Sequence, residues 1–445
     1  MNSRKKVILT IVLLSYFVTA IDSSIVITGL AKMTEDLRLS QVTLSWVQNA
    51  YVLAFGGFIL LGGKLSDVFG RKRIMDIALI LFGGASAVAG AAGNAGIMIA
   101  ARFIQGAGAA IMAPTSLALL MDTFEGEERI RAVAWYSSIS GLGSSVGLVL
   151  GGLLASYLSW RDGFYINVPL TIFMLLLSLR TLQYIPVNHF HFDILGTILS
   201  IAGIFALVYA INGAKQEGLW LVVALILLVA FVFTEAKSSV PVMPLALFHS
   251  RTRSGAYLVR ALYMCAMLGF WFFISEYLQD VLGYSPIQTG LAFFPMTLSI
   301  FAAAICVPRF SEKAGDRTVL WAGISCLIIG FLWMLSVTEQ SSYVWTIMPA
   351  LLFMGLGQGF CVSPLTNLGI RGTKPENAGA ASGLVNVAHQ VGGSIGLAVM
   401  VSAGVNAGGA MQEFHLAMAI GLGFVLASAL FTLFLIPKAV PAASR

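Results

Sequence analysis

The sequence predicts an all-α polytopic membrane protein with fourteen transmembrane helices, arranged as two six-helix halves and two further helices between them. Three observations lead to this prediction: the composition, the spacing of the apolar runs and an internal repeat. Of the 445 residues, 58% are hydrophobic and only 10% are charged, whereas a soluble domain carries about 25% charged residues. A chain with so few charges is expected to expose most of its surface to lipid.

Apolar runs near the ~20 residues that cross a bilayer recur along the whole chain. Fourteen are found, at 7–31, 44–63, 74–93, 97–121, 131–157, 164–183, 193–212, 218–235, 255–279, 286–308, 318–337, 343–369, 378–403 and 412–436. An even number places both termini on one side. Twenty Lys and Arg residues fall on that side, four fall opposite, and Arg102 and Arg260 lie inside helices, which accounts for all 26. This asymmetry predicts cytoplasmic termini.

Several function classes are not expected. The net charge of +6 does not indicate nucleic-acid binding, because the basic residues form short clusters between apolar runs. The four cysteines lie inside apolar runs and are interpreted as small core residues rather than disulfides or metal ligands. The sequence has no nucleotide-binding G-x-x-x-x-G-K-[ST], no metal-ligand spacing and no catalytic triad signature. We therefore expect neither an enzyme nor a cofactor.

The second and third apolar runs are joined by a basic turn, Gly63-Lys64-Leu65-Ser66-Asp67-Val68-Phe69-Gly70-Arg71-Lys72-Arg73. Gly63 suits a close helix approach and Gly70 suits a helix end. Asp67 precedes Arg71 by four residues, the spacing of a helical charge pair, and Lys72 adds a further cation. The turn predicts a tight hairpin between two membrane helices.

Two parts of the chain about 250 residues apart are similar to each other. Three pairs match: Pro308–Arg317 with the basic turn at an offset of 245, Gly392–Leu397 with Gly143–Leu148 at 249, and Pro364 with Pro114 at 250. Internal repeats of this kind are typical of transporters. We therefore predict two halves related by a pseudo-two-fold axis, residues 1–185 and 253–445, with a two-helix insertion at 186–252.

These motifs resemble those of the major facilitator superfamily, in particular its fourteen-helix drug:proton antiporter branch of the bacterial multidrug efflux type. The basic turn resembles the superfamily's G-x-L-x-D-x-x-G-R-K-R. Residues 102–109 resemble the R-x-x-Q-G-x-G-A of the fourth helix, and residues 143–153 the antiporter signature of the fifth, with Leu148 where that signature has proline. Further similar stretches are 20–26, 160–169 and 192–196. The resemblance implies the major facilitator fold and proton-coupled export.

Two charged residues inside predicted helices are candidates for proton coupling, because charge in the bilayer is costly and indicates function. At 1.5 Å per residue, Asp22 and Arg102 both lie about 8 Å below the outer surface of the hydrocarbon core. Gln105 lies one turn from Arg102 on the same face, and Asn49 lies near that depth. We expect Asp22 to carry the proton and the other three to control its charge. The alternative is a static ion pair between two helices.

His389 and Gln390 lie near the middle of the thirteenth predicted helix, where the similar antiporters often have Arg-Gln. Histidine titrates near physiological pH, so His389 is a candidate second proton site or substrate contact, with Gln390 supporting it. An interhelical hydrogen bond is the alternative. Arg260 lies one or two turns above the inner edge of its helix, where snorkelling is one explanation.

Aromatic residues of the ninth and tenth predicted helices are candidates for substrate contact in the cavity expected between the halves. Phe270, Trp271, Phe273 and Phe294 suit flat lipophilic and cationic compounds through stacking and cation–π contact. Glu276, at the outer end of the ninth helix, is placed to attract cations. Half or more of these aromatic side chains must nevertheless face lipid or the core.

Glycines Gly143, Gly147, Gly151 and Gly152 give the fifth predicted helix small-residue faces. Such faces permit close helix packing. In the antiporters that this helix resembles, they also imply helices that bend or slide during transport.

The resulting prediction is a bacterial plasma-membrane protein that exports lipophilic drugs, cationic ones included, in exchange for protons by alternating access. Its expected partners are small-molecule substrates, protons and the lipid bilayer, without nucleic acid, and we expect a monomer. Two alternatives stay open: a proton-coupled exporter of one endogenous metabolite, and an uncoupled lipid-handling flippase or scaffold. Proton release on substrate binding excludes the last, and substrate breadth separates the first two.

Overall fold

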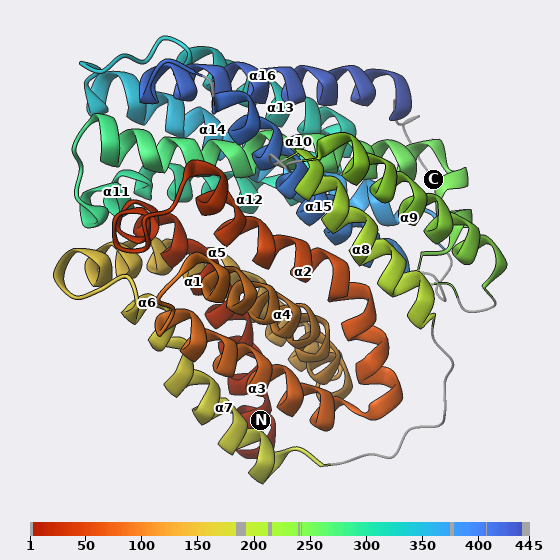
Figure 1. Cartoon of the computed structure of the whole chain (residues 1–445). Coiled ribbons are helices and arrows are strands. Elements are labelled where there is room, and N and C mark those ends of the chain that lie inside the picture. The colour runs from red at the N-terminus through yellow and green to blue at the C-terminus, as the bar shows by residue number, and fades with distance from the viewer. Residues whose placement is uncertain are drawn as a thin grey trace. The chain divides into compact units, whose positions relative to one another are not determined.

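The computed structural model describes residues 3–183, 193–211, 216–238, 241, 243–373, 378–405 and 407–437, and this part of the chain is helical almost throughout (Figure 1). Within it, thirteen helical segments are long and apolar enough to cross a membrane, and Val146–Tyr157 is a shorter apolar segment. The predicted all-helical membrane fold is thereby confirmed. The order of six, two and six helices stays a prediction.

The chain forms two compact units. Unit 1 comprises Met1–Val242 and Leu278–Leu291, and unit 2 comprises Met243–Tyr277 and Ala292–Arg445. The predicted boundary between residues 185 and 186 lies outside the described residues. The division into 1–185, 186–252 and 253–445 therefore stays a prediction.

Unit 1 is built around α4. Its helices are α1 (Ser3–Leu37), α2 (Gln41–Phe69), α3 (Arg71–Gly90), α4 (Ala95–Thr123), α5 (Gly126–Tyr157), α6 (Asp162–Tyr165), α7 (Asn167–Thr181), α8 (Ile194–Ile211), α9 (Glu217–Lys237) and most of α11 (Pro286–Ala292). Helix α4 packs against α1, α2 and α3, while α1 also packs against α5 and α7. A polar side chain on the inner face of α1 or α4 is therefore surrounded by other helices rather than by lipid.

The starts of α2 and α4 are fixed by polar caps, which satisfy backbone N–H groups that a helix leaves unpaired. The Ser40 hydroxyl accepts a hydrogen bond from the Thr43 amide at 3.2 Å, and the Asn94 side chain accepts one from the Ile97 amide at 3.0 Å. These caps set where each helix begins and hence the height at which its polar residues lie.

Helices α8 and α9, the described part of the predicted insertion, pack against each other, and α8 packs against α2. Aromatic rings make these contacts: the centroids of Trp46 and Phe205 are 5.2 Å apart, and those of Tyr209 and Trp220 are 5.0 Å apart. The other side of α9 exposes large apolar side chains, among them Leu225 and Phe233. A helix of this kind suits contact with lipid tails.

Unit 2 is centred on α10 (Arg251–Glu276), which packs against α14 (Met348–Ile370), α15 (Ala378–Gly404) and α16 (Ala410–Leu435). The remaining elements are α12 (Phe294–Ala314), α13 (Asp316–Met334), a 3₁₀ helix at Leu245–His249 and a π-helical turn at Tyr343–Ile347. A second π-helical turn, Tyr277–Val281, begins with the last residue of one segment of unit 2 and otherwise belongs to unit 1. All four cysteines of the chain lie in this unit as free thiols, two of them buried.

Two pairs of the sequence repeat have the same local structure. Gly70 between α2 and α3 has φ 87°, and Gly315 between α12 and α13 has φ 81°. Both lie in the left-handed region that favours glycine, which lets the chain reverse between two helices within one residue. Pro114 lies inside α4 and Pro364 inside α14. These positions are alike in both units.

Candidate functional site

The structure brings the two predicted membrane charges into direct contact in unit 1. The Arg102 Nη1 atom of α4 lies 2.7 Å from the Asp22 Oδ2 atom of α1, and the side chains are 0% and 1% exposed. The attraction between the two charges offsets part of the cost of removing each of them from water. The depth count from the sequence thus places correctly two residues that are 80 positions apart.

The second oxygen of Asp22 is held by two amides. Gln105 Nε2 donates to Asp22 Oδ1 at 2.7 Å, and Asn167 Nδ2 of α7 donates to the same atom at 2.8 Å. Gln105 Nε2 also lies 2.7 Å from the Ser86 hydroxyl of α3, while its oxygen accepts from Arg102 at 2.7 Å. Asp22 is thereby the centre of a network that joins α1, α3, α4 and α7.

Arg102 is clamped by groups other than the carboxylate. Its Nε atom donates to the Val47 carbonyl of α2 at 3.2 Å. Its guanidinium carbon lies 4.3 Å from the Tyr51 ring centroid and 5.8 Å from that of Phe164. Cation–π contacts of this kind attract a guanidinium and are stronger in a site without water. The Nη2 atom has no hydrogen-bond partner among the described residues.

Asn167 and Ser86 are site residues that the sequence interpretation does not find. Asn167 is 0% exposed and is the first residue of α7. The feature of the sequence that could have identified it is its polar amide side chain within the stretch Phe164–Pro169. Asn49, which the sequence does propose, is buried at 0% exposure in α2. Neither of its amide atoms has a hydrogen-bond partner in the described part of the chain.

The glycines of α5 lie against α1 on the turns around Asp22. A Cβ on Gly147 would lie 2.9 Å from the Ile21 Cα atom and 2.8 Å from the Ser24 Cβ atom, closer than side chains approach. Gly143 and Gly151 face the preceding and following turns of α1, and Gly152 faces the backbone at Pro286. Because these glycines leave no room for a side chain of their own against α1, α5 sits directly beside the carboxylate-bearing helix.

The basic turn ties three helix ends together. Arg71 donates from Nη1 to the Ser66 hydroxyl at 2.7 Å and from Nε to Asp122 at the end of α4 at 3.1 Å. Lys72 Nζ reaches the Leu179 carbonyl of α7 at 3.3 Å. Gly63 lies beside Pro114: a Cβ atom added to Gly63 would be 3.8 Å from the Cβ atom of Pro114. The side chain of Asp67 lies outside the described part, so its predicted pairing with Arg71 stays a prediction.

The candidates in unit 2 do not form one cluster. Phe270 and Phe273 are 0% and 3% exposed and belong to the core, whereas Phe294 is 45% exposed. Trp271 is partly buried against Phe293, with ring centroids 4.8 Å apart. Glu276, His389 and Gln390 are also partly buried. The expectation that many of these aromatic side chains face core or lipid describes Phe270 and Phe273 well.

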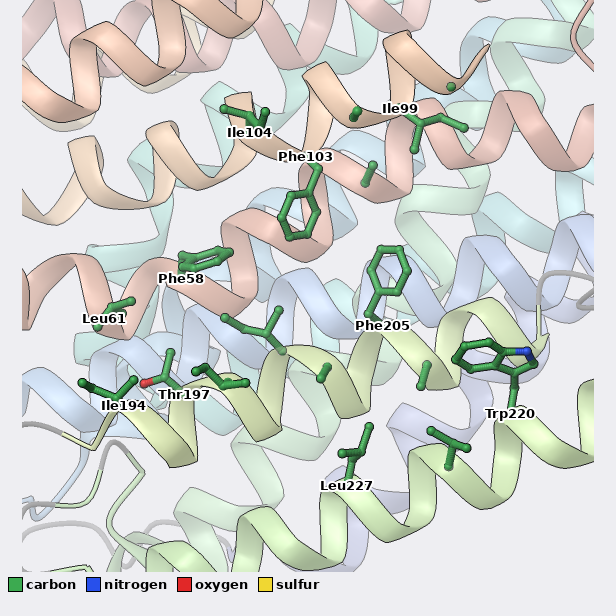
Figure 2. A pocket seen from close by; sticks show the side chains of 18 residues that line it. Phe58, Leu61, Ile99, Phe103, Ile104, Ile194, Thr197, Phe205, Trp220 and Leu227 are labelled. Atoms are coloured by element: carbon green, nitrogen blue, oxygen red, sulfur yellow. The ribbon is translucent and has the colours of Figure 1, made fainter.

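A lipophilic cavity of about 890 Å³ lies within unit 1, between the α2–α4 pair and the α8–α9 pair (Figure 2). Figure 2 shows Phe58, Phe103 and Phe205 turned towards one another across it, with the centroid of Phe103 6.1 Å from Phe58 and 6.2 Å from Phe205. Among its lining side chains only Thr197 and Trp220 carry a polar atom. The size is that of a small-molecule pocket, but the lining has few groups that orient a ligand.

The chain is similar to known transporters along most of its length. The sequence model of the Major Facilitator Superfamily matches residues 12–397. Puromycin resistance protein pur8 of Streptomyces alboniger is 34% identical, with 98% of this chain and 92% of that protein covered. Cephamycin export protein CmcT of Amycolatopsis lactamdurans is 33% identical, with 87% and 82% covered.

The crystal structure of an auto-inhibited POT family peptide transporter has a similar fold, with a TM-score of 0.73 over 100% of this chain and 99% of that one. At 15% identity this is a likeness of fold alone. The motif resemblance is confirmed by the family match and by relatives that are named as resistance and export proteins. The protein is a transporter rather than an enzyme, and the chain belongs to the Major Facilitator Superfamily.

Proposed function

We propose that this protein exports lipophilic drugs, cationic ones included, across the bacterial plasma membrane in exchange for protons. The observation that carries the proposal is the fully buried Asp22 carboxylate, bound by Arg102, Gln105 and Asn167. A buried carboxylate in the middle of a membrane-spanning apolar run is a candidate proton site by default. The names of the relatives, puromycin resistance and cephamycin export, support export as the direction.

Protonation of Asp22 is the event that drives the cycle in this proposal. A neutral Asp22 no longer balances Arg102, and leaving one partner of a buried pair uncompensated costs ~3–5 kcal/mol. A free-energy change of this size shifts a two-state equilibrium by about two to four orders of magnitude. Because the network joins α1, α3, α4 and α7, the loss of the charge weakens the contacts among four helices at once. Protonation therefore favours a different arrangement of these helices.

Two other regions fit this role. The basic turn holds the ends of α2, α4 and α7 through Arg71 and Lys72, so it is placed to fasten one state of unit 1. The glycine face of α5 allows that helix to slide along α1 without interlocked side chains. In the proposal the basic turn stabilises one conformation of unit 1, and α5 moves along α1 when the conformation changes. Both termini are cytoplasmic in this orientation.

The proton supplies enough energy for the task. One charge crossing ~100 mV is worth about 2.3 kcal/mol, and one pH unit adds about 1.4 kcal/mol. One proton therefore supports a gradient of roughly a few hundredfold for a neutral substrate. Exchange of one proton for one monovalent cation is electroneutral and uses the pH term alone.

Proton-coupled export of a single endogenous metabolite is the second candidate, and the name of the relative CmcT favours it. It uses the same Asp22 chemistry and differs only in substrate breadth. Efflux measured with structurally unrelated compounds separates the two. Competition between those compounds supports multidrug export, and transport of one chemical series alone supports the metabolite exporter.

The proposal is tested by dye efflux from cells under an imposed pH gradient, with a fluorescent lipophilic cation as the substrate. Wild type is expected to extrude the dye, and Asp22→Asn at equal abundance is expected to fail. Asp36→Asn is the matched control, because Asp36 lies on the same helix but accepts a hydrogen bond from Trp160 at 2.8 Å instead of an ion pair. If Asp22→Asn pumps as well as Asp36→Asn, Asp22 is not the proton site. If wild type extrudes the dye at the same rate with and without the pH gradient, the result supports an uncoupled flippase.

A further inference from the structure

A second arginine is buried in unit 2, in the middle of α10. Arg260 is 5% exposed and lies nine residues after Arg251, the start of the helix, which is about 13.5 Å along its axis. Its Nη1 atom donates to the Val362 carbonyl of α14 at 2.9 Å, and its guanidinium carbon lies 6.0 Å from the Tyr263 ring centroid. This burial leaves no route for the guanidinium to snorkel to the helix end.

Arg260 has no carboxylate to balance it in the described part of unit 2. The neighbouring helices α14 and α15 contain no Asp or Glu. Helix α16 has Glu413, in its first turn beside Gly404 at the far end of α15. The acidic residue of α10 itself is Glu276, sixteen positions away and about 24 Å along the helix. A buried cation without a counter-charge is costly and is seldom retained in a membrane helix without a function.

Polar side chains with spare hydrogen-bonding capacity lie at the same level. Tyr263 is 1% exposed. Gln358 of α14 lies one turn before Val362, whose carbonyl Arg260 contacts, and His389 of α15 lies one turn before Gly392, which faces the Ala261 backbone. Arg260 Nε, Gln358 Oε1 and His389 Nδ1 are all buried atoms without a hydrogen-bond partner in the described residues. Three helices therefore bring open polar positions to this buried cation.

We propose that Arg260, with Tyr263, Gln358 and His389, binds the carboxylate or another anionic group of an amphiphilic substrate. A guanidinium presents several N–H donors in a plane that matches the oxygens of such a group. The Tyr263 hydroxyl and an N–H at the open Nδ1 atom of His389 supply further donors, while the open Oε1 atom of Gln358 accepts a hydrogen bond from an N–H or O–H group of the ligand. An anion balances the charge of Arg260 and uses its free Nε atom, so one ligand satisfies both needs of the site.

The rest of the ligand is apolar, because the site lies within an apolar helix bundle. A purely cationic group is disfavoured beside Arg260 by like-charge repulsion. The ligand class of this site is therefore an amphiphilic anion or zwitterion, in addition to the lipophilic cations of the proposed function. This inference rests on the proposed function only in calling the ligand a substrate, since binding itself requires neither a pH gradient nor Asp22.

The test is equilibrium binding to the purified full-length protein in nanodiscs of uncharged lipid. The probes are pyrenebutyrate and its methyl ester, which differ in charge and little else. Wild type is expected to bind the carboxylate at least tenfold more tightly than the ester, a difference of about 1.4 kcal/mol. In Arg260→Gln the ratio is expected to fall to about one, with the affinity for the ester unchanged. Arg260→Lys, which keeps the charge but loses the planar donors, is expected to keep part of the preference.

Arg251→Gln is the matched control, because Arg251 lies at the exposed end of the same helix. It is expected to keep the wild-type ratio. Thermal stabilisation of wild type by the carboxylate, and not by the ester, provides a second measurement that needs no variant. Equal affinities of wild type for the two probes, or a preference retained in Arg260→Gln, overturns the proposal.

A second arm distinguishes a substrate from a lipid headgroup. The binding is repeated in nanodiscs that contain phosphatidylglycerol. An unchanged preference for pyrenebutyrate supports a substrate site. Loss of the preference, with phosphatidylglycerol retained by wild type and not by Arg260→Gln in native mass spectrometry, overturns the assignment to a substrate. Failure of the Asp22→Asn efflux test leaves the probe ratio unaffected, so the two proposals fail separately.

Discussion

Arg102 and Arg260 are both arginines buried in apolar helices, with 0% and 5% of their surface exposed, but their surroundings differ in charge. Arg102 faces the carboxylate of Asp22 at 2.7 Å and two aromatic rings. Arg260 faces a backbone carbonyl and one ring, and no carboxylate lies on the helices α14 and α15 beside it. The charges of the first site balance each other, and we call it the closed site. The second site carries a net positive charge.

The difference teaches how a membrane protein uses the same costly residue in two ways. A buried charge must be compensated by a protein group or by something that comes and goes. In unit 1 the compensating group is a carboxylate, whose charge a proton can remove. In unit 2 the compensation is left to a ligand. Each variant below alters one side of this contrast, and the expected effects decrease in order.

Removal of one charge from the closed site is expected to have the largest effect. Asp22→Asn leaves Arg102 buried without a carboxylate, which costs ~3–5 kcal/mol of stability. The double variant Asp22→Asn/Arg102→Gln removes both charges and is expected to regain most of that loss, while remaining inactive in efflux. The measurement is the melting temperature of the purified proteins. If the single and double variants melt together, the pair is not electrostatically coupled.

The amides around Asp22 are expected to have the next largest effect. Asn167→Ala removes a 2.8 Å hydrogen bond to a charged oxygen, and such bonds contribute ~1.5–3 kcal/mol. Asn49→Ala is the control, because Asn49 is equally buried but has no hydrogen-bond partner in the described part of the chain. The prediction is a lower melting temperature and weaker gradient-driven efflux for Asn167→Ala than for Asn49→Ala. The reverse order would show that Asn49 contacts Asp22 in the transport cycle.

These residues also show what the sequence can predict. The all-helical membrane fold follows from composition and run length, because a bilayer permits few alternatives to helices. The contact of Asp22 with Arg102 follows from counting depth, since helix rise is constant and charges inside the bilayer are few. The sequence also predicts that Gly70 and Gly315 match, and both have a positive φ.

Depth does not determine which way a side chain points around its helix axis. Asn49 lies near the depth of Asp22, yet in the structure Asn167 holds the carboxylate. Asn167 follows the short helix α6, and the break before α7 sets its direction in a way that periodicity does not record. The full burial of Arg260 likewise depends on how α14 and α15 pack over α10. Rotation and packing, rather than helix position, are what the sequence leaves open.

The site at Arg260, which has no counter-charge, is expected to lose little stability when its charge is removed. Arg260→Gln removes an uncompensated buried cation, so its stability in the absence of ligand is expected to lie within about 1 kcal/mol of wild type, or above it. This is the opposite of the expectation for Asp22→Asn. The measurement is again the melting temperature, with Arg251→Gln as the control at the end of the same helix. A loss as large as that of Asp22→Asn would show that Arg260 is compensated by a protein group, and the contrast between the two units would disappear.

The smallest effect is expected at an ion pair that water reaches. Lys5 of α1 lies 2.6 Å from Glu128 of α5, with the side chains 37% and 40% exposed. The hydrogen bond from Lys5 lowers the pKa of Glu128 below its ordinary value of 4.5. The stability that this carboxylate contributes is therefore present above the ordinary pKa and is lost as the pH falls through the lower pKa of the folded protein.

Wild type is accordingly expected to melt slightly above Glu128→Gln at pH 7, and the difference is expected to vanish under acid conditions below pH 4.5. High salt is expected to remove it at pH 7 as well, because exposed pairs are screened. The difference between wild type and Asp22→Asn is expected to persist in high salt, since both partners of that pair are excluded from solvent. If salt reduces both differences alike, water and ions reach Asp22, and the pair is not excluded from solvent as its burial indicates.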